Sequence, residues 1–250
     1  MRITGIIPAR YGSSRFPGKP LAKIAGKTLI ERVYRQAERA GLEKIIVATD
    51  DERIKDEVLA FGGNAVMTGE HHSGTDRIAE ASLNEDCDAV INIQGDEPLI
   101  DPAVIVAVSS ALTNNTWADI TTAAVGIYST SEIDNPNVVK VVFAGNGRAL
   151  YFSRSKIPYS LNSLNVTTGN GNIPAGYFKH IGIYGYKKEF LKKFVALKPS
   201  PLELAESLEQ LRALENGFAI HVSIVEYNCV AVDVPADVIK VENILKNKNK

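Results

Sequence analysis

The first half of the chain alternates short, wholly apolar segments with amphipathic ones, and this pattern is the strongest constraint on the fold. Residues 3–7, 44–49 and 89–93 each have an apolar centre without alternation, so each predicts a strand covered on both faces. Residues 29–40 carry an apolar stripe at helical spacing and are followed by Gly41, which suits a helix end. Strands of this kind, separated by helices, predict a parallel sheet between two helical layers.

The second half has a different pattern, with several alternating segments that are typical of half-exposed strands. Further elements are predicted as helices at 51–61 and 73–83, strands at 65–67, 119–128, 138–143, 148–153, 177–186 and 219–225, and a helix from Pro235. A flexible loop is predicted at 160–175, which is rich in Asn, Ser, Gly and Thr. Ser200, Pro201 and Glu203 predict the capped start of one helix that ends at Gly217. The chain is therefore expected to be one compact α/β domain with two lobes.

The overall composition excludes several classes of protein. The 250 residues include 29 acids and 28 bases, for a net charge of -1, which argues against a nucleic-acid coat or a polybasic membrane anchor. Cys87 and Cys229 are too few for a disulfide framework and are expected to be free thiols in a reducing compartment. No apolar run reaches the length of a membrane span or a signal-peptide core. We therefore expect a cytoplasmic protein with no membrane insertion and no nucleic-acid partner.

The charge is unevenly distributed, because the first 30 residues carry six bases and no acid. Three of these bases, Arg10, Arg15 and Lys19, lie in a loop of glycines and serines that follows the first strand. Loops at the carboxyl ends of parallel strands bind ligands, and this one could hold a polyphosphate through cations and backbone N–H groups. Its glycine spacing differs from a Walker loop, and Pro20 stands where a magnesium-binding Ser or Thr would be. A solvated basic loop is the alternative.

Two aspartates are candidates for a metal site. Asp96 follows the strand at 89–93, and Asp233 is placed at the end of a late apolar strand, so both are expected at the same edge of the sheet. Paired carboxylates at such an edge suit magnesium beside a nucleotide phosphate. Asp233 could equally cap the last helix, and Glu97 could cap the next helix after the strand at 89–93. The residues alone leave both interpretations of Asp233 open.

Other polar residues are ambiguous on sequence alone. His71 and His72 have no third ligand at helical spacing, so zinc is not predicted, and Ser73 is interpreted as a helix cap. In the second half, alternation places His180 and Tyr184 on one strand face. The predicted helix from Ser200 places Glu206, Glu209, Gln210 and Ala213 on one face. Such faces suit a polyhydroxylated anion, but a half-exposed sheet with a satisfied histidine explains them equally well.

Characteristic motifs extend along almost the whole chain. They lie at residues 7–21 (IPARYGSSRFPGKPL), 47–50, 72–77, 92–98 (NIQGDEP), 135–142, 149–158 (ALYFSRSKIP), 180–186, 200–203 and 208–212 (LEQLR). Through them the sequence resembles the 3-deoxy-manno-octulosonate (Kdo) cytidylyltransferases. The first motif is shared with other sugar nucleotidyltransferases, whereas the later ones together are far more specific.

The resemblance implies a fold and an activity. The implied fold is a nucleotide-diphospho-sugar transferase-like, Rossmann-like three-layer sandwich with a mainly parallel sheet and a smaller α+β dimerisation lobe. Its parts would be a nucleotide-binding lobe at 1–128, a sugar-binding and dimerisation lobe at 129–226, and a return to the first lobe at 227–250. The implied reaction is magnesium-dependent transfer of CMP from CTP to Kdo, giving CMP-Kdo and pyrophosphate for lipopolysaccharide biosynthesis by a homodimer.

The resemblance also implies roles for individual residues. The CTP site would comprise Pro8, Ala9, Arg10, Ser13, Arg15, Lys19, Ser73, Gly74, Gln94 and Gly95. Asp96 and Asp233 would hold magnesium and, with Arg10, Arg15 and Lys19, form the catalytic group. The sugar site would comprise Arg154, His180, Tyr184, Glu209 and Gln210. Alternatives are a cytidylyltransferase for 8-amino-Kdo or another acid sugar such as sialic acid, and a nucleotide-binding protein without turnover.

Overall fold

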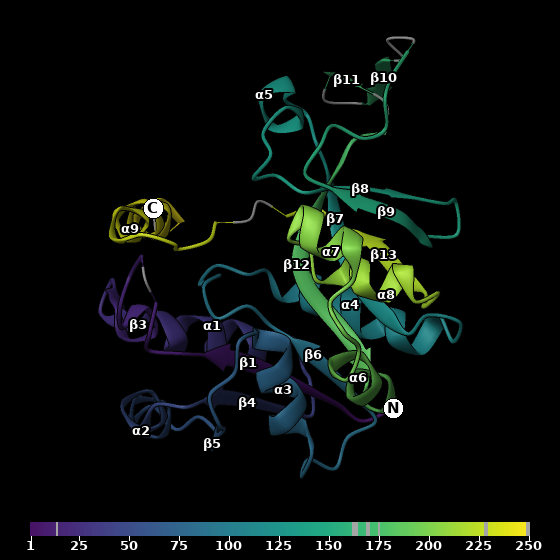
Figure 1. Cartoon of the computed structure of the whole chain (residues 1–250). Coiled ribbons are helices and arrows are strands. Elements are labelled where there is room, and N and C mark those ends of the chain that lie inside the picture. Colours follow the sequence, from purple (N-terminus) through teal and green to yellow (C-terminus); the bar gives the residue numbers. More distant parts are fainter. Residues whose placement is uncertain (14, 162–164, 169–170, 175, 228–229, 249–250) are drawn as a thin grey trace.

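A computed structural model describes the chain except for residues 14, 162–164, 169–170, 175, 228–229 and 249–250 (Figure 1). Its strands are β1 (Ile3–Ala9), β2 (Lys23–Ile24), β3 (Lys27–Thr28), β4 (Lys44–Thr49), β5 (Ala65–Met67), β6 (Ala89–Asn92), β7 (Ile120–Gly126), β8 (Lys140–Phe143), β9 (Ala149–Ser153), β10 (Asn165–Thr168), β11 (Gly171–Pro174), β12 (Phe178–Lys187) and β13 (Ile220–Ile224). Its helices are the 3₁₀ helix η1 (Lys19–Leu21) and α1 (Leu29–Glu38), α2 (Glu52–Ala60), α3 (Gly74–Ser82), α4 (Pro102–Asn114), α5 (Thr130–Ile133), α6 (Lys188–Val195), α7 (Pro201–Glu206), α8 (Gln210–Glu215) and α9 (Pro235–Lys248).

One sheet of nine strands joins the two halves of the chain. Seven strands form the order β13-β7-β12-β6-β1-β4-β5, and β8 and β9 extend from β12. β1 pairs in parallel with both β4 and β6, whereas β12 is antiparallel to β6 and β7. Because β1 has a parallel partner on each side, its carboxyl end opens at the centre of one sheet edge. The sheet is therefore mainly parallel, as the sequence predicted.

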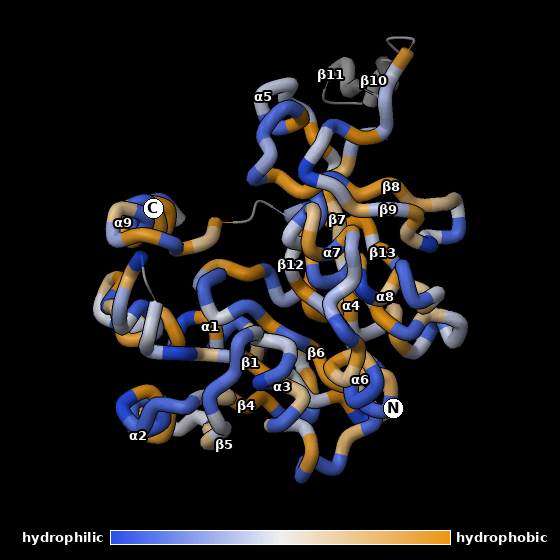
Figure 2. The backbone as a smooth tube through the Cα atoms, viewed as in Figure 1, coloured by the Kyte–Doolittle hydropathy of each residue, from blue (hydrophilic) through white to orange (hydrophobic). Residues whose placement is uncertain are grey.

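Both faces of the sheet are buried, which explains the wholly apolar strands. Neighbouring residues of β1 enter opposite cores: Ile6 packs with α3, α6 and α8, and Ile7 packs with α1, α2 and α4. Both side chains are fully buried. In Figure 2, hydrophobic residues gather in the strands of the sheet, while the outer helices α1, α2 and α3 combine hydrophobic and hydrophilic residues. The predicted three-layer arrangement is confirmed.

The single helix predicted from Ser200 to Gly217 is wrong, although its capping box is present. The helix breaks at Ser207, whose φ of 51° is left-handed, and the chain resumes as α8. The break allows Arg212 to pair with Glu203 through contacts of 2.5 and 2.8 Å. Residues nine apart in a continuous helix would be separated by about 13.5 Å along its axis. Glu206 and Glu209 consequently belong to different turns and face different partners.

Two further expectations need correction. The segment at 160–175 contains the antiparallel strands β10 and β11 rather than only a loop, and the β-branched residues of β10 favour this extended backbone. Asp233 does not follow a strand, because the described residues between β13 and α9 have no ladder partner. Their backbone is instead held by single contacts, described below.

The last helix, α9, packs against the first lobe. In Figure 1, α9 lies next to β3 and α1, while α5, β10 and β11 project at the top of the molecule. Val232 and Val241 are fully buried against Ile24 and Leu29, so α9 is anchored to the first lobe. No helix within the described residues is long and apolar enough to cross a membrane.

The positive φ of Ser207, between α7 and α8, provides a test of the helix break. We expect Ser207→Gly to raise the free energy of unfolding by about 0.5–1 kcal/mol, because glycine adopts positive φ without strain. Urea unfolding measures the change, and Ser207→Ala is the control because alanine keeps the Cβ. A glycine variant no more stable than the alanine variant would contradict the described backbone.

Candidate active site

A cavity of about 270 Å³ lies at the carboxyl ends of β1 and β6. All the residues predicted to bind CTP line it, together with both predicted metal carboxylates. Its wall is completed by residues that the sequence did not single out as ligands: Pro20, His71, His72 and Arg77. Segments from four distant parts of the chain thus meet at one sheet edge.

The basic loop is folded around the backbone of Tyr11. Its carbonyl oxygen accepts the N–H groups of Ser13 at 3.0 Å and Gly18 at 2.9 Å. Gly18 has a φ of 69° and precedes η1, which begins with Lys19. A Cβ at Gly18 would also lie 3.1 Å from the Tyr11 ring. The loop therefore needs glycine here to turn Lys19 into the cavity.

Close backbone approaches bring the cavity walls together at Pro8. A Cβ on Gly95 would lie 2.8 Å from the Pro8 carbonyl oxygen, and a Cβ on Gly74 would lie 3.3 Å from its Cγ. Gly95 follows β6 and Gly74 opens α3, so both elements approach the end of β1 more closely than a larger residue would allow. The glycines explain how the cavity walls meet at this point.

The two predicted metal carboxylates converge on one ammonium group. Lys19 Nζ lies 3.0 Å from Asp96 Oδ2 and 3.6 Å from Asp233 Oδ1, and it donates to the Val232 carbonyl at 2.9 Å. Arg15 adds a contact of 3.1 Å to Asp233. These carboxylates are 137 positions apart in sequence, yet the N–H of Val232 donates to the Asp96 carbonyl at 2.8 Å. The backbone itself therefore fixes their proximity.

The alternative roles for these acids are not those seen in the structure. The carboxylate of Asp233 faces Lys19 and Arg15, while Asp237 accepts the N–H groups at the start of α9. Asp101 caps α4 by accepting the Ala103 N–H at 2.8 Å. Glu97 is buried and accepts a hydrogen bond from Tyr227 at 3.1 Å.

One cation of the loop is left for a ligand. The exposed side chain of Arg10 lines the cavity and has no ion pair or hydrogen bond with any residue the structure describes. Arg15 and Lys19, in contrast, are paired with aspartates. A negatively charged ligand would meet the free guanidinium first and could then compete for the other two cations.

The start of α3 forms the opposite wall. Ser73 caps the helix by accepting the Asp76 N–H at 3.0 Å, as the sequence predicted. Arg77 is buried and donates to Asp50 Oδ2 and Thr68 Oγ1, both at 2.6 Å, which ties α3 to the ends of β4 and β5. Its place within the motif at 72–77 was the only sequence signal for this role.

A histidine pair lies on the same wall. His71 Nε2 is bonded to Glu80 Oε2, and both carboxylate oxygens of Glu80 accept the Gly69 N–H. The hydrogen bond from His71, followed by that from Gly69, lowers the pKa of Glu80. The carboxylate therefore fixes His71 in place beside the cavity.

A second polar cluster lies beyond α3 and contains four of the five predicted sugar residues. His180 packs between the rings of Phe152 and Tyr184, with centroid distances of 5.0 and 5.3 Å, and its Nε2 lies 3.0 Å from Thr122 Oγ1. Thr75 donates to Glu209 Oε2 at 2.5 Å. Gly74 thus faces the cavity while the next residue contacts the cluster, so α3 joins the two.

Burial shifts the pKa values of the cluster's titratable side chains in the direction that favours their neutral forms. Desolvation lowers the pKa of His180 to about 3, so its imidazole is neutral at physiological pH. Burial, and secondarily the charge of Glu209, raises the pKa of Tyr184. Burial also raises the pKa of Glu209 itself. Gln210 is 4 % exposed, and its Nε2 has no partner among the described residues, which is typical of a group awaiting a ligand.

Comparison with known proteins agrees with this geometry. A family model described as cytidylyltransferase matches residues 4–224. The 3-deoxy-manno-octulosonate cytidylyltransferase of Syntrophotalea carbinolica is 48% identical and aligns with 98% of this chain and 99% of its own. That of Bacteroides thetaiotaomicron is 49% identical over 100% of both chains. The chain belongs to the 3-deoxy-manno-octulosonate cytidylyltransferase family.

A solved structure extends the comparison to three dimensions. CMP:2-keto-3-deoxy-manno-octonic acid synthetase, complexed with CTP, superposes with a TM-score of 0.92 and 41% identity. The match covers 99% of this chain and 100% of that one. The nucleotidyltransferase fold predicted from the sequence is therefore confirmed.

Arg154, the fifth residue predicted for the sugar, is bonded to the backbone. Its guanidinium donates to the carbonyls of Glu206 at 2.7 Å, Pro136 at 3.1 Å and Ser207 at 3.4 Å. The buried ammonium of Lys140 donates to the Arg154 carbonyl at 2.6 Å. Arg154 is thus firmly placed, although no hydrogen bond joins its side chain to that of His180.

The contact between β1 and β6 can be tested with a single methyl group. We expect Gly95→Ala to weaken CTP binding at least tenfold, because the new Cβ forces Gly95 away from the Pro8 carbonyl and opens the cavity wall. Calorimetric titration with CTP measures the loss. Gly145→Ala, whose Cβ would meet nothing within 4 Å, is the matched control. Equal affinities of both variants would contradict the described wall.

Proposed function

We propose that this protein transfers CMP from CTP to Kdo, giving CMP-Kdo and pyrophosphate. One observation carries the proposal: a single cavity combines the basic loop with two converging carboxylates, and α3 links it directly to a buried polar cluster. The first part suits a nucleoside triphosphate, and the second suits a hydroxylated sugar acid. The names of the family relatives support both substrates.

The basic loop would bind the triphosphate and stabilise the leaving group. Transfer requires the sugar hydroxyl to attack the α-phosphorus in line with departing pyrophosphate, which depends on positioning and charge neutralisation. The donors of Arg10 are not bonded to any part of the chain that the structure describes, and Arg15 and Lys19 would exchange their aspartate contacts for phosphate oxygens. These three cations would hold the pyrophosphate as negative charge develops on it.

The two carboxylates fit a magnesium ion. Lys19 contacts both, so their oxygens already reach one small cation, and carboxylate oxygen is the ligand type magnesium prefers. Among the residues described, no group of three or more His, Cys, Asp or Glu could hold a metal. Asp96 and Asp233 would therefore share magnesium with substrate oxygens. When bound, it would supply Lewis-acid charge stabilisation at the phosphate.

The cluster beyond α3 would orient the sugar. Neutral His180 and the unpartnered amide of Gln210 offer hydrogen bonds without a buried charge, while Glu209 and Tyr184 offer further polar contacts. Arg154 would meet the sugar carboxylate, because its three carbonyl contacts use only three of the five N–H donors of a guanidinium. Hydrogen bonds from the neutral groups of the cluster would recognise the sugar by its shape and by the positions of its hydroxyl groups.

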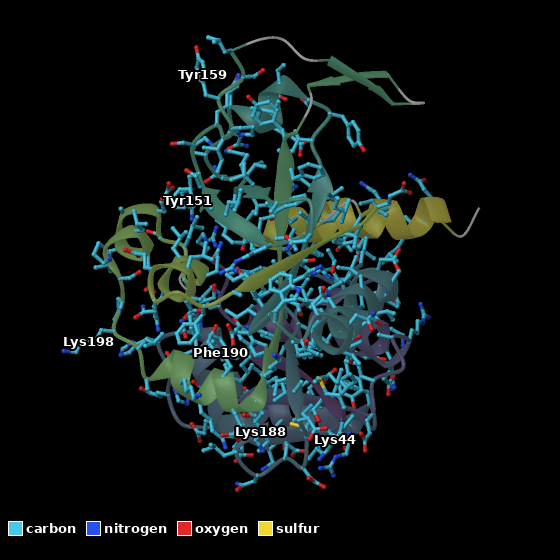
Figure 3. The ribbon with its side chains drawn as sticks, turned by 90° about the vertical axis from the view of Figure 1, so that its right-hand side faces the viewer. Lys44, Tyr151, Tyr159, Lys188, Phe190 and Lys198 are labelled. Atoms are coloured by element: carbon cyan, nitrogen blue, oxygen red, sulfur yellow. The ribbon has the colours of Figure 1, made fainter. Side chains whose placement is uncertain are left out.

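We also propose that the chain acts as a homodimer through the lobe at 129–226, with residues 1–128 binding the nucleotide and residues 227–250 returning to them. Within residues 129–226, the stretch after β9 exposes the large hydrophobic side chains of Tyr159 at 83% and Leu161 at 84%. In Figure 3, Tyr159 lies at one end of the molecule, far from Lys44 and from Lys188 of the same range, which lie at the opposite end. Cytoplasmic location and supply of lipopolysaccharide synthesis stay predictions.

A pyrophosphate-release assay tests the activity. With CTP, magnesium and Kdo, we expect turnover that falls at least about 100-fold in Asp96→Asn, because the neutral amide is a poor ligand for magnesium and removes the ion pair between Asp96 and Lys19. Asp101→Asn is the control, since it replaces a nearby helix cap with another good cap. Near-normal turnover of Asp96→Asn would remove this carboxylate from the metal site.

The same assay separates the alternatives. Faster release with 8-amino-Kdo or sialic acid than with Kdo would change the assigned sugar. No release with any of the three sugars would favour a nucleotide-binding protein without turnover.

The dimer is tested by sedimentation. We expect the double variant Tyr159→Asp with Leu161→Asp to shift the protein from dimer to monomer, because buried carboxylates oppose apolar contact. Leu59→Asp changes a residue that is 52% exposed on α2 and should leave the dimer intact. An unchanged dimer in the double variant would place the interface elsewhere.

A further inference from the structure

Asp233 reaches the cavity from a segment with no ladder partner, so its direction depends on local contacts. The residue before it is held on both sides. Val232 donates its N–H to the Asp96 carbonyl at 2.8 Å, and its carbonyl accepts from Lys19 Nζ at 2.9 Å. These contacts fix the entry to Asp233 but leave the peptide groups that follow to be held by something else.

Asp237 holds those groups. Its Oδ2 accepts the N–H of Asp233 at 3.0 Å and the N–H of Val234 at 3.1 Å. Asp237 is the third residue of α9, so the contact to Val234 resembles the return half of a capping box. The contact to the Asp233 N–H is not part of a capping box, and it holds the backbone of a residue assigned to the metal site.

The carboxylate that makes these contacts is itself well placed. Its Oδ1 pairs with Lys240 Nζ at 2.8 Å, one turn further along α9, and its side chain is 14% exposed. The hydrogen bond from Lys240, with those from the Asp233 and Val234 N–H groups, lowers the pKa of Asp237 to about 2. A full negative charge therefore stands at the amino end of the helix at all working pH values.

The helix that carries Asp237 is fixed to the same lobe as the basic loop. Val241 is fully buried against Ile24 and Leu29, and Glu242 Oε1 accepts the Ala25 N–H at 2.8 Å. Figure 1 shows α9 beside β3, at the edge of the first lobe. Because α9 is fixed to the first lobe, Asp237 holds the backbone of Asp233 in place.

We propose that Asp237 is a positioning residue, whose carboxylate fixes the peptide groups on both sides of the Asp233 Cα and so directs the Asp233 carboxylate toward the cation shared with Asp96. The proposal rests on the proposed function, in which Asp233 holds magnesium. Partners of this kind, which orient a metal ligand without touching the metal, change metal affinity or activity by about 10–100-fold when removed.

The test compares three changes at and around this carboxylate. Asp237→Ala removes the acceptor, Asp237→Asn keeps one oxygen that can accept both N–H groups, and Lys240→Met removes only the ion pair. With CTP present and no sugar, we expect Asp237→Ala to bind Mn²⁺ about tenfold more weakly, measured by electron paramagnetic resonance of the free ion. The asparagine and methionine variants should bind Mn²⁺ within about threefold of the natural protein.

A matched control separates positioning from stability. Asp119→Ala removes another carboxylate that accepts a backbone N–H, from Ala219 at 2.9 Å, at the opposite sheet edge. We expect it to lose a comparable free energy of unfolding in urea while keeping normal Mn²⁺ binding and normal kcat. Asp237→Ala should lower kcat about tenfold with little change in the KM for Kdo.

Three results are decisive. Mn²⁺ affinity of Asp237→Ala equal to that of the natural protein, or equal losses of Mn²⁺ affinity in Asp237→Ala and Asp119→Ala, would overturn the positioning role. Asp233→Asn tests the underlying assignment by itself. If that variant also binds Mn²⁺ normally, the metal role of Asp233 fails and the positioning role fails with it. If Asp233→Asn loses Mn²⁺ while Asp237→Ala keeps it, only the role of Asp237 is overturned.

Discussion

The parallel pairing of β1 with both β4 and β6 is the constraint on which the rest of the structure depends. Because β1 is bonded on two sides and buried on two faces, the chain can leave it only at the sheet edge. The loop that follows then stands beside the residues after β6 and the start of α3. Gly95 and Gly74 permit this close approach to Pro8, so the cavity is a consequence of how three elements meet.

The electrostatics of the site follow from that meeting. The basic loop would repel itself without counter-charges, and Asp96 and Asp233 supply them through Lys19 and Arg15. Every one of these groups is also one that a triphosphate with magnesium would engage in the proposed reaction. Mutual neutralisation between these carboxylates and the basic loop holds the cavity walls together.

The second cluster uses a different physical solution. His180 stays neutral because burial opposes its charge, and it is packed between aromatic rings rather than paired with a carboxylate. Arg154 is held by backbone carbonyls, and the buried Lys140 holds the carbonyl of Arg154 in turn. The lobe therefore places its polar groups through packing and backbone contacts, in contrast to the ion pairs of the first cavity.

The sequence by itself determined the alternation of strands and helices that gives a parallel sheet, the basic loop, the cap of α3 and the family. These features depend on local periodicity, short motifs and glycine positions. It could not determine the break at Ser207, which serves the pairing of Arg212 with Glu203. Nor could it separate a helix cap from a metal ligand at Asp233. Only the tertiary structure decided that Asp237 takes the cap contacts and Asp233 faces Lys19, because these choices depend on long-range packing of α9 against the first lobe.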